Sequence, residues 1–325
     1  MACRAPATVA NTSATHGTVP APGSRFDIAY RIAMPEPTSH FFDVNIDIGN
    51  VSGDDIQLQM PVWSPGRYAR FDFARTVQDL TISAPGSAPL RWERENGSLW
   101  RVHTGGAHAI AVHYHVYANT LSGTFSVLDT AHANWNGASV FMYVVDHKPD
   151  PVSLHVDVPA DMHIVNGDER SPDQTDYRFE NYDRLIDTPT EVAPALMVDS
   201  FTVDGRLYRT MVHHNGPSTT VQRRRFVGDV EKIVRYENSV FGPPPLEMYT
   251  FLFNIGYAGG DGMEHLYSTQ IINRNPWRDD DPLLAGIGTA AHEYFHVWNV
   301  KRVRPIAPRP VRLHARAVST QSVGC

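Results

Sequence analysis

The chain has 325 residues and a mass of 36.2 kDa, which is long for one domain and sufficient for two. It is 42% apolar and 19% charged, with a mean hydropathy of −0.31, so it can bury a core and is not a disordered chain. The net charge of −7 leaves no positive excess for a polyphosphate backbone, which argues against a nucleic-acid partner. The two cysteines, Cys3 and Cys325, stand near the two ends, which excludes a disulfide framework and a cysteine-ligated zinc module.

Neither a membrane span nor a leader is visible in the sequence. No stretch approaches the ~18 consecutive apolar residues of a membrane-spanning helix, so no membrane partner is expected. Residues 1–24 are rich in Ala, Thr, Pro and Ser and lack the continuous apolar run of a signal peptide. We therefore expect a mobile tail over residues 1–24. The compartment stays open, with the cytoplasm favoured over secretion.

Residues 25–203 have the pattern of short β-strands. Turn-forming clusters such as Ser52-Gly53-Asp54 and Asn166-Gly167-Asp168 separate the candidate strands. A succession of strands without helical periodicity predicts an all-β N-terminal domain, either a sandwich or a barrel. The strands are predicted where apolar and polar residues alternate, with β-branched and aromatic types enriched, over 41–50, 55–63, 109–118, 139–145, 152–160 and 195–203.

The pattern changes after residue 203. Residues 206–214 predict one more strand, and apolar residues then recur at nearly helical spacing over 218–240. Gly242 and the three prolines that follow it end this predicted helix. The segment 248–257, MYTFLFNIGY, has the composition of a buried strand.

A second helix is predicted over residues 282–304. Asp281 is a favourable N-cap residue, and Pro282 suits the first helical position. Basic residues in the last turn suit the negative end of the helix dipole. Residues 204–305 therefore predict a partial α+β unit, and the whole chain an α+β multidomain fold with a sandwich-like β domain first.

The sharpest chemical signal is His292-Glu293-Tyr294-Phe295-His296, inside this second helix. Residues four apart lie on one face of a helix, so both imidazoles can reach one metal ion. Glu293 then stands beside the metal, where it can take a proton from bound water. The pattern predicts a Zn²⁺ site with ligands His292 and His296. The alternative is a histidine pair on an ordinary helix.

A second signal is Gly260-Asp261-Gly262-Met263-Glu264-His265, just after the strand 248–257. A glycine-rich strand end lets a substrate backbone approach closely, and the Glu264 carboxylate can hold a free amino group. This predicts substrate binding at Gly262, Met263 and Glu264. The alternative is a hairpin turn with an exposed acid.

The stretch HEYFHVWNVKRVRP, at 292–305, together with GMEH at 262–265, resembles the glycyl aminopeptidase family of gluzincin zinc metallopeptidases. Members of that family have an N-terminal β domain, a thermolysin-like catalytic domain and a C-terminal PDZ domain. Four stretches of the N-terminal half are also similar to that family, namely PVWSPGRYARFDFAR, VYANTLS, WNGAS and YDRLIDTPTEVA.

The resemblance implies a role for each matching residue. His292 and His296 would be zinc ligands, Glu293 the general base, and Glu264 the anchor for the substrate's amino group. The implied activity is aminopeptidase cleavage of small N-terminal residues from peptides with a free N-terminus.

The chain departs from the family pattern at its C-terminal end. Thermolysin-like sites take a third zinc ligand, usually a glutamate on a later helix. No Asp or Glu follows Arg304, and residues 306–325 carry no helical period. Codons allowed for residues 311–318, read one nucleotide later, can encode the family-like Phe-Asp-Tyr-Thr-Arg-Glu. We therefore expect a frameshifted tail at 306–325, truncation before the PDZ domain, weak or absent zinc binding and no measurable peptidase activity.

The sequence leaves two further functions open. One alternative is a non-catalytic β-sandwich binding module with a vestigial metalloprotease helix, and another is an endopeptidase. Histidine pairs on strands could also bind metal. An ordinary strand face or an exposed edge, without a metal, is the commoner interpretation of such pairs, which here are His113/His115, His213/His214 and His103/His108. His265 could line the cleft beside Glu264.

Overall fold

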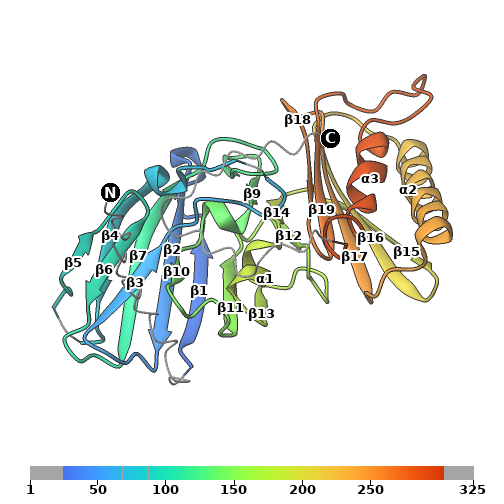
Figure 1. Ribbon diagram of the computed structural model, residues 1–325. Coiled ribbons are helices and arrows are strands. Elements are labelled where there is room, and N and C mark those ends of the chain that lie inside the picture. Colours follow the sequence, from blue (N-terminus) through green and yellow to red (C-terminus); the bar gives the residue numbers. More distant parts are fainter. Residues whose placement is uncertain (1–24, 68, 87, 304–325) are drawn as a thin grey trace, which may run out of the picture.

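The computed structural model describes residues 25–303 apart from 68 and 87 (Figure 1). The predicted mobile tail at 1–24 and the predicted frameshifted tail at 306–325 lie outside the described residues. Four sheets form the described part of the chain, and they are arranged side by side from the N-terminal to the C-terminal end (Figure 1). No helix among the described residues is long and apolar enough to cross a membrane.

The first two sheets form the predicted sandwich. The first has the strand order β13 (Asp176–Phe179), β11 (Val152–Asp157), β1 (Asp27–Ala33), β2 (Phe41–Gly49), β7 (Ala109–Tyr117) and β4 (Val77–Ser83). The second has the order β10 (Tyr143–Val144), β3 (Asp55–Gln59), β6 (Leu99–His103) and β5 (Trp92–Arg94).

One apolar core joins these two sheets. In β2 every second side chain is buried, as the alternating pattern predicts, and the opposite face is partly exposed. Leu58 of β3 and Trp100 of β6 bury their side chains in the same core as Val44 and Ile46 of β2. Burial of each such side chain contributes about 1.5–3 kcal/mol, so this core alone can stabilise the N-terminal unit.

The third sheet links the sandwich to the remainder of the chain. Its strand order is β12 (His163–Asn166), β14 (Thr190–Ala193), β9 (Ala133–Trp135) and β8 (Val127–Leu128). Short helices accompany the first three sheets: α1 (Tyr182–Ile186), η1 (Pro37–Ser39), η2 (Phe73–Thr76) and η3 (Gly137–Ser139).

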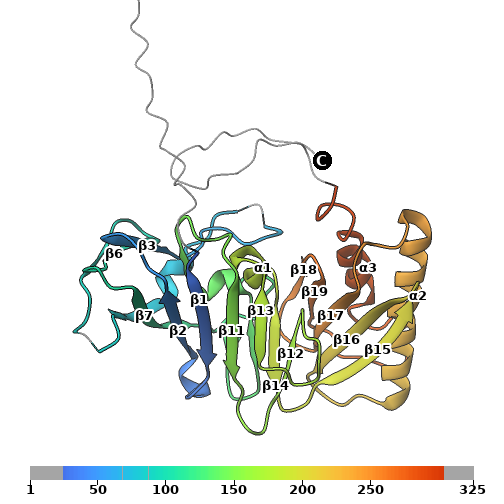
Figure 2. The ribbon, with the colours of Figure 1, turned by 90° about the horizontal axis from the view of Figure 1, so that it is seen from below.

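The fourth sheet and two helices form the α+β unit. The strand order is β15 (Met197–Val203), β16 (Arg206–His214), β17 (Met248–Ile255), β19 (Ser268–Asn273) and β18 (Gly260–Glu264). Strands β16, β17 and β19 are parallel, and all eight residues of β17 are buried, as expected for a strand covered on both faces. Helices α2 (Thr220–Phe241) and α3 (Ile287–Phe295) cover the face turned away from the N-terminal sheets (Figures 1 and 2).

The helix predicted over 218–240 is α2. Thr219 and Gln222 form a capping box at its start, where each side chain pairs with the other residue's backbone N–H. Gly242, with a φ of 80°, ends it before the prolines. Its buried side chains Phe226, Val230 and Val234 join the core of the fourth sheet.

The boundary predicted at residue 203 is wrong for the sheets. Strand β15 was expected to be the last strand of the N-terminal domain, yet it pairs along its whole length with β16 in the fourth sheet. A two-residue turn at Asp204 and Gly205, both with positive φ, closes this hairpin. Strand alternation alone does not tell which sheet a strand joins, so the change of sheet falls between β14 and Met197.

The helix predicted over 282–304 is also much shorter, because α3 spans only Ile287–Phe295. Its N-cap is Gly286, whose φ of 97° favours glycine, rather than Asp281. Beyond His296 the chain continues in turns, where Arg302 Nη1 donates to the carbonyl of Val297 at 2.7 Å. Side-chain contacts there satisfy carbonyls that a longer helix would have satisfied.

The fold class expected from the sequence is confirmed. An all-β sandwich-like N-terminal part is followed by a partial α+β part that contains α2 and α3.

Candidate functional site

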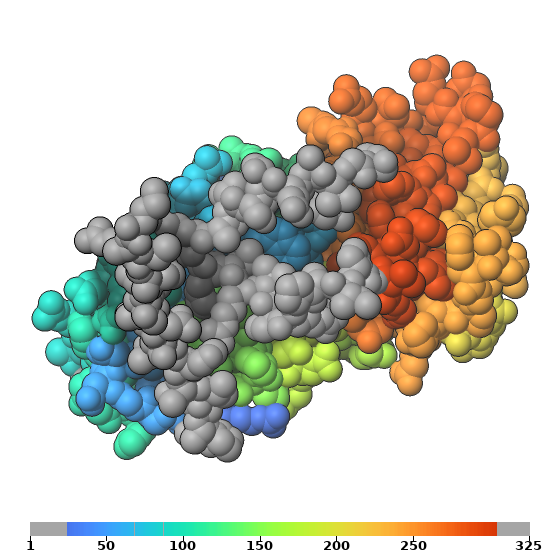
Figure 3. Space-filling model, viewed as in Figure 1, coloured from blue at the N-terminus to red at the C-terminus, as the bar shows by residue number. Residues whose placement is uncertain are grey.

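Helix α3 brings the two histidines of the motif together. Their Nε2 atoms are 3.3 Å apart, and in the space-filling view the segment that contains α3 reaches the molecular surface (Figure 3). Two nitrogen ligands of a tetrahedral zinc ion would be about 3.3 Å apart, since each Zn–N bond is ~2.0–2.1 Å. His296 Nδ1 lies 2.6 Å from the carbonyl oxygen of Asn299, which fixes the ring and leaves Nε2 for a metal. The pair fits a zinc ion.

Glu293 is buried between α3 and the edge strand β18. Only 5% of it is exposed, and an added Cβ at Gly262 would come within 2.0 Å of its Oε1 atom. The absence of a side chain at Gly262 therefore makes room for this carboxylate. Burial raises the pKa of Glu293 to about 7, and the charges of Glu264 and Asp261 raise it further while Arg67 lowers it.

Glu264 lies in the same cluster. It ends β18, is 7% exposed, and has a carboxylate oxygen within 4.8 Å of donor atoms of Glu293 and His296. His292 adjoins this cluster through His296. The geometry thus brings together all four charged or metal-binding side chains predicted for the site. It also permits Glu264 to act either on a substrate amine or on the metal.

Gly262 and Met263 contribute to the site in different ways. Among the described residues β18 is the edge strand of its sheet and pairs with β19, and its accessible part is residues 260–262. The side chain of Met263 is wholly buried, and a Cβ added at Gly66 would lie only 2.6 Å from its sulfur. Met263 is 0% exposed as a whole residue, backbone included, so it packs the interior of the site, and its predicted contact with substrate stays a prediction.

Loops of the N-terminal unit complete the site. Arg67 Nη2 pairs with Asp261 Oδ2 at 2.5 Å, and the backbone N–H of Gly123 donates to the same oxygen at 2.8 Å. Gly66, with a φ of 84°, passes so close that an added Cβ would lie 2.7 Å from Glu264 Oε2. The proximity of Gly66 to Glu264 was missed, because no local pattern encodes contacts 198 residues apart.

His265 does not line the cleft, contrary to one expectation. It is 2% exposed, and its Nδ1 atom is 3.0 Å from Asp187 Oδ1. Lys301 Nζ, which follows α3, is 3.2 Å from the same oxygen. Although burial raises the pKa of Asp187, the charge of Lys301 and the bond from His265 hold it below its usual range. Asp187 of the N-terminal unit thus holds the turn after β18 through His265 and the segment after α3 through Lys301.

Among the described residues, no carboxylate that could be a third metal ligand follows α3, since 294–303 contain no Asp or Glu. The carboxylates within 4.8 Å of the His296 imidazole are those of Glu293 and Glu264.

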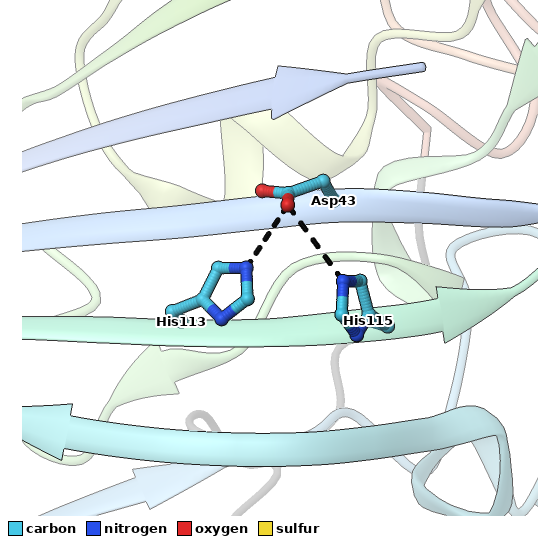
Figure 4. A group of neighbouring side chains, drawn as sticks. All are labelled: Asp43, His113 and His115. Carbon is cyan, nitrogen blue, oxygen red and sulfur yellow. Dashed lines mark hydrogen bonds and ion pairs between the residues drawn. The ribbon is translucent and has the colours of Figure 1, made fainter. Parts of the chain in front are cut away.

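Two other features lie apart from this site. His113 and His115 of β7 converge on Asp43 of β2, at 3.0 and 3.7 Å (Figure 4). These side chains are about one-quarter to one-third exposed, and His115 also contacts Asp79, so ion pairing accounts for them. A surface cavity of about 820 Å³ lies at β1, β11 and β13, and none of the predicted site residues lines it.

Comparison with known proteins gives two family matches. The model described as the Peptidase M61 N-terminal domain matches residues 29–194, and that described as M61 glycyl aminopeptidase matches residues 285–322. The second match continues past the point where a frameshift is predicted, and that prediction stays a prediction. No curated protein matches the chain.

Solved structures are also similar. A crystal structure of an aminopeptidase N family protein from Idiomarina loihiensis has a TM-score of 0.79 and 27% identity, over 89% of this chain and 50% of that one. The chain thus spans half the length of that protein. An M1 zinc metallopeptidase from Deinococcus radiodurans and a mutant of it have TM-scores of 0.47 and 0.49 and identities of 16% and 15%. They cover 84% and 85% of this chain, and 63% and 65% of theirs.

The N-terminal family match spans half of the chain, and the second match contains the segment His292 to His296 of α3. The chain therefore belongs to the M61 glycyl aminopeptidase family, which is a family of peptidases.

Proposed function

We propose that this site is the catalytic centre of a zinc-dependent aminopeptidase. The observation that carries the proposal is the pairing of two Nε2 atoms 3.3 Å apart with a buried glutamate on the same helix, packed against an edge strand. His292 and His296 would hold zinc, and the adjacent Glu293 would serve as general base. Bound zinc would supply Lewis-acid chemistry at the scissile carbonyl.

Glu293 moves the proton in this scheme. Its carboxylate takes a proton from the attacking water and passes it to the amine that leaves. The packing of Glu293 against Gly262 holds the carboxylate beside β18, where the scissile bond of a bound peptide would lie. The low exposure of Glu293 keeps bulk water away from the transferred proton.

Glu264 and β18 bind the substrate in this scheme. An extended peptide pairs with the open edge of β18, and the Glu264 carboxylate pairs with its N-terminal ammonium group. Cleavage is then restricted to the first peptide bond. The Gly66 backbone lies so close to Glu264 that the space for the first side chain is small, which supports a preference for small N-terminal residues.

A polypeptide of these 325 residues holds zinc weakly in this proposal. Two imidazoles and the nearby buried carboxylates lack the later glutamate of thermolysin-like sites, and no Asp or Glu follows Arg304. We therefore expect no measurable hydrolysis of alanyl- or glycyl-nitroanilide by this polypeptide, with or without added zinc. Stoichiometric tight zinc with turnover would overturn that expectation.

A chimera tests the catalytic proposal itself. It joins residues 1–304 of this chain to the segment that follows the counterpart of α3 in the Idiomarina loihiensis protein. We expect zinc-dependent hydrolysis of alanyl-nitroanilide, reduced about 10²–10⁴-fold by Glu293→Gln. Glu231→Gln, on the outer face of α2, is the matched control and should retain activity. Hydrolysis that survives Glu293→Gln would refute the assignment of the base.

A further inference from the structure

A buried histidine without a hydrogen-bond partner lies between the third and fourth sheets. His132, just before β9, is 2% exposed, and neither ring nitrogen makes a hydrogen bond within the described part of the chain. Burying an unpaired imidazole costs free energy, roughly 1–3 kcal/mol for each unsatisfied polar group. A buried polar group of this kind calls for a partner, which the described part of the chain does not supply.

Two more metal-binding side chains meet His132. Glu191 of β14 and His213 of β16 each have a donor atom within 4.8 Å of one on His132 and of each other. Glu191 is wholly buried and His213 is 7% exposed. The rings of His132 and His213 are 4.9 Å apart between centroids, so they form one compact group. We call His132, Glu191 and His213 the inter-sheet cluster.

The second polar atom of each ligand already has a neighbour that would orient it. The Tyr257 hydroxyl is 2.8 Å from His213 Nε2 and 3.2 Å from Nδ1, and Nδ1 also lies 2.9 Å from Glu191 Oε1. Glu191 Oε2 accepts hydrogen bonds from Asn134 at 2.8 Å and Asn254 at 3.1 Å. The Asp129 carboxylate is 3.5 Å from His132 Nδ1. Outer contacts of this kind orient the ligands of protein metal sites.

We propose that the inter-sheet cluster is a second metal site, which binds Zn²⁺ or a similar borderline transition metal. Two imidazoles and one carboxylate form a donor set that suits zinc, whereas Mg²⁺ and Ca²⁺ take oxygen ligands. The negative charges of Glu191 and Asp129 would balance a divalent cation. The site shares no residue with α3, so the proposal of a second metal site does not depend on the proposed peptidase function.

The bound ion would hold the two parts of the molecule together. His132 and Glu191 belong to the third sheet and its loops, whereas His213 belongs to the fourth sheet. One ion would therefore bridge the N-terminal unit and the unit that carries α3. An ion can enter from the loop before β9, where Ala131 is exposed and Asp129 is partly exposed.

Metal counting in a variant without the α3 pair tests this site. In the 325-residue chain, His292→Ala with His296→Ala removes the first site, and elemental analysis after equilibration with Zn²⁺ counts what remains. We expect one zinc ion per chain, none when His132→Asn is added, and a thermal stabilisation by Zn²⁺ that the same substitution abolishes. Mg²⁺ should give neither effect. The His132 side chain makes no hydrogen bond among the described residues, so replacing it removes none from the described fold.

Two further variants sharpen the result. Asp129→Asn should weaken zinc binding about 10–100-fold, as loss of an outer-shell partner does. His155→Asn, on the exposed side of β11, is the matched control and should keep the full zinc content. The proposal is overturned if the variant without the α3 pair holds no zinc, which would leave a buried water molecule as the partner of His132. It is also overturned if His132→Asn leaves the zinc content unchanged.

Discussion

At the scale of single residues, Gly262 sets how closely β18 approaches Glu293. A Cβ at this position would lie 2.0 Å from Glu293 Oε1 and 2.9 Å from Thr289 Cγ2, so Gly262→Ala must displace the carboxylate. We predict a loss of about 10²-fold in kcat/KM of the chimera, because small misplacements of catalytic groups cost that much. Gly260→Ala is the control on the same strand, since no atom lies within 4 Å of its added Cβ. Equal effects of the two substitutions would contradict this account.

Glu264 can be assigned to substrate or metal by separating two measurements. If it anchors the substrate ammonium, Glu264→Gln raises KM of the chimera at least about tenfold, since a charged hydrogen bond contributes ~1.5–3 kcal/mol. The zinc affinity, measured by competition with a chelator, should then stay unchanged. A fall in zinc affinity would instead make Glu264 a ligand, which its position within 4.8 Å of His296 also permits.

Single residues also show how much of the candidate site could be predicted from the sequence. The four-residue spacing of His292 and His296 sufficed to predict that their imidazoles meet, because helical geometry is local. The proximity of Glu264 followed only from the family resemblance. The inter-sheet cluster was not predictable, since its three residues come from segments far apart in the chain and become neighbours only through sheet packing.

At the scale of elements, α2 contains a buried acid with no partner for one of its oxygens. Glu237 is 8% exposed, its Oε2 atom makes no hydrogen bond among the described residues, and burial raises its pKa to about 8. The folded state therefore holds a proton that the unfolded chain releases near pH 4.5. Stability should fall as the pH rises from about 4.5 to 8, by on the order of 2–4 kcal/mol from this group.

Glu237→Gln tests this pH dependence. Denaturant unfolding at a series of pH values should show a smaller loss of stability for the variant, which stays uncharged throughout. Glu231→Gln, on the same helix but paired with Arg235, provides the control and should keep the pH dependence of the original chain. An unchanged pH profile in Glu237→Gln would refute the prediction.

Elements were predictable to the extent that their patterns are local. The alternation in β2 and β7 and the helical spacing of apolar residues in α2 gave these elements nearly to the residue. The strand expected over 139–145 is only β10, at Tyr143–Val144, because Phe141 and Met142 are buried in the core without a strand partner. A buried apolar run has no period that separates a strand from another buried conformation.

At the scale of the whole molecule, the site lies where the N-terminal unit meets β18. Arg67 and Asp261, 194 residues apart, form one of the ion pairs between these parts. Each side chain is about one-quarter exposed. A double-mutant cycle with Arg67→Gln and Asp261→Asn should give a coupling free energy of about 0.5–1 kcal/mol in unfolding experiments. A coupling of zero would mean that the two parts associate without this pair.

The division of the chain was predicted less well than its elements. Strand counts and composition predicted an all-β part followed by an α+β part. Strand β15, however, belongs to the fourth sheet and so to the α+β part. Its alternating pattern is the same in either sheet, and only the pairing with β16 decides. Long-range pairing is therefore the information that local sequence patterns lack.

The central claim, that α3 is a zinc-binding helix, is tested most directly by zinc titration of the 325-residue chain. The titration uses chains with His132→Asn, so that the inter-sheet cluster does not contribute. We predict one weak zinc equivalent, which disappears when His292→Ala and His296→Ala are added and persists with the control His155→Asn. Zinc binding that is unaffected by the α3 substitutions, or absent before they are made, would contradict the account.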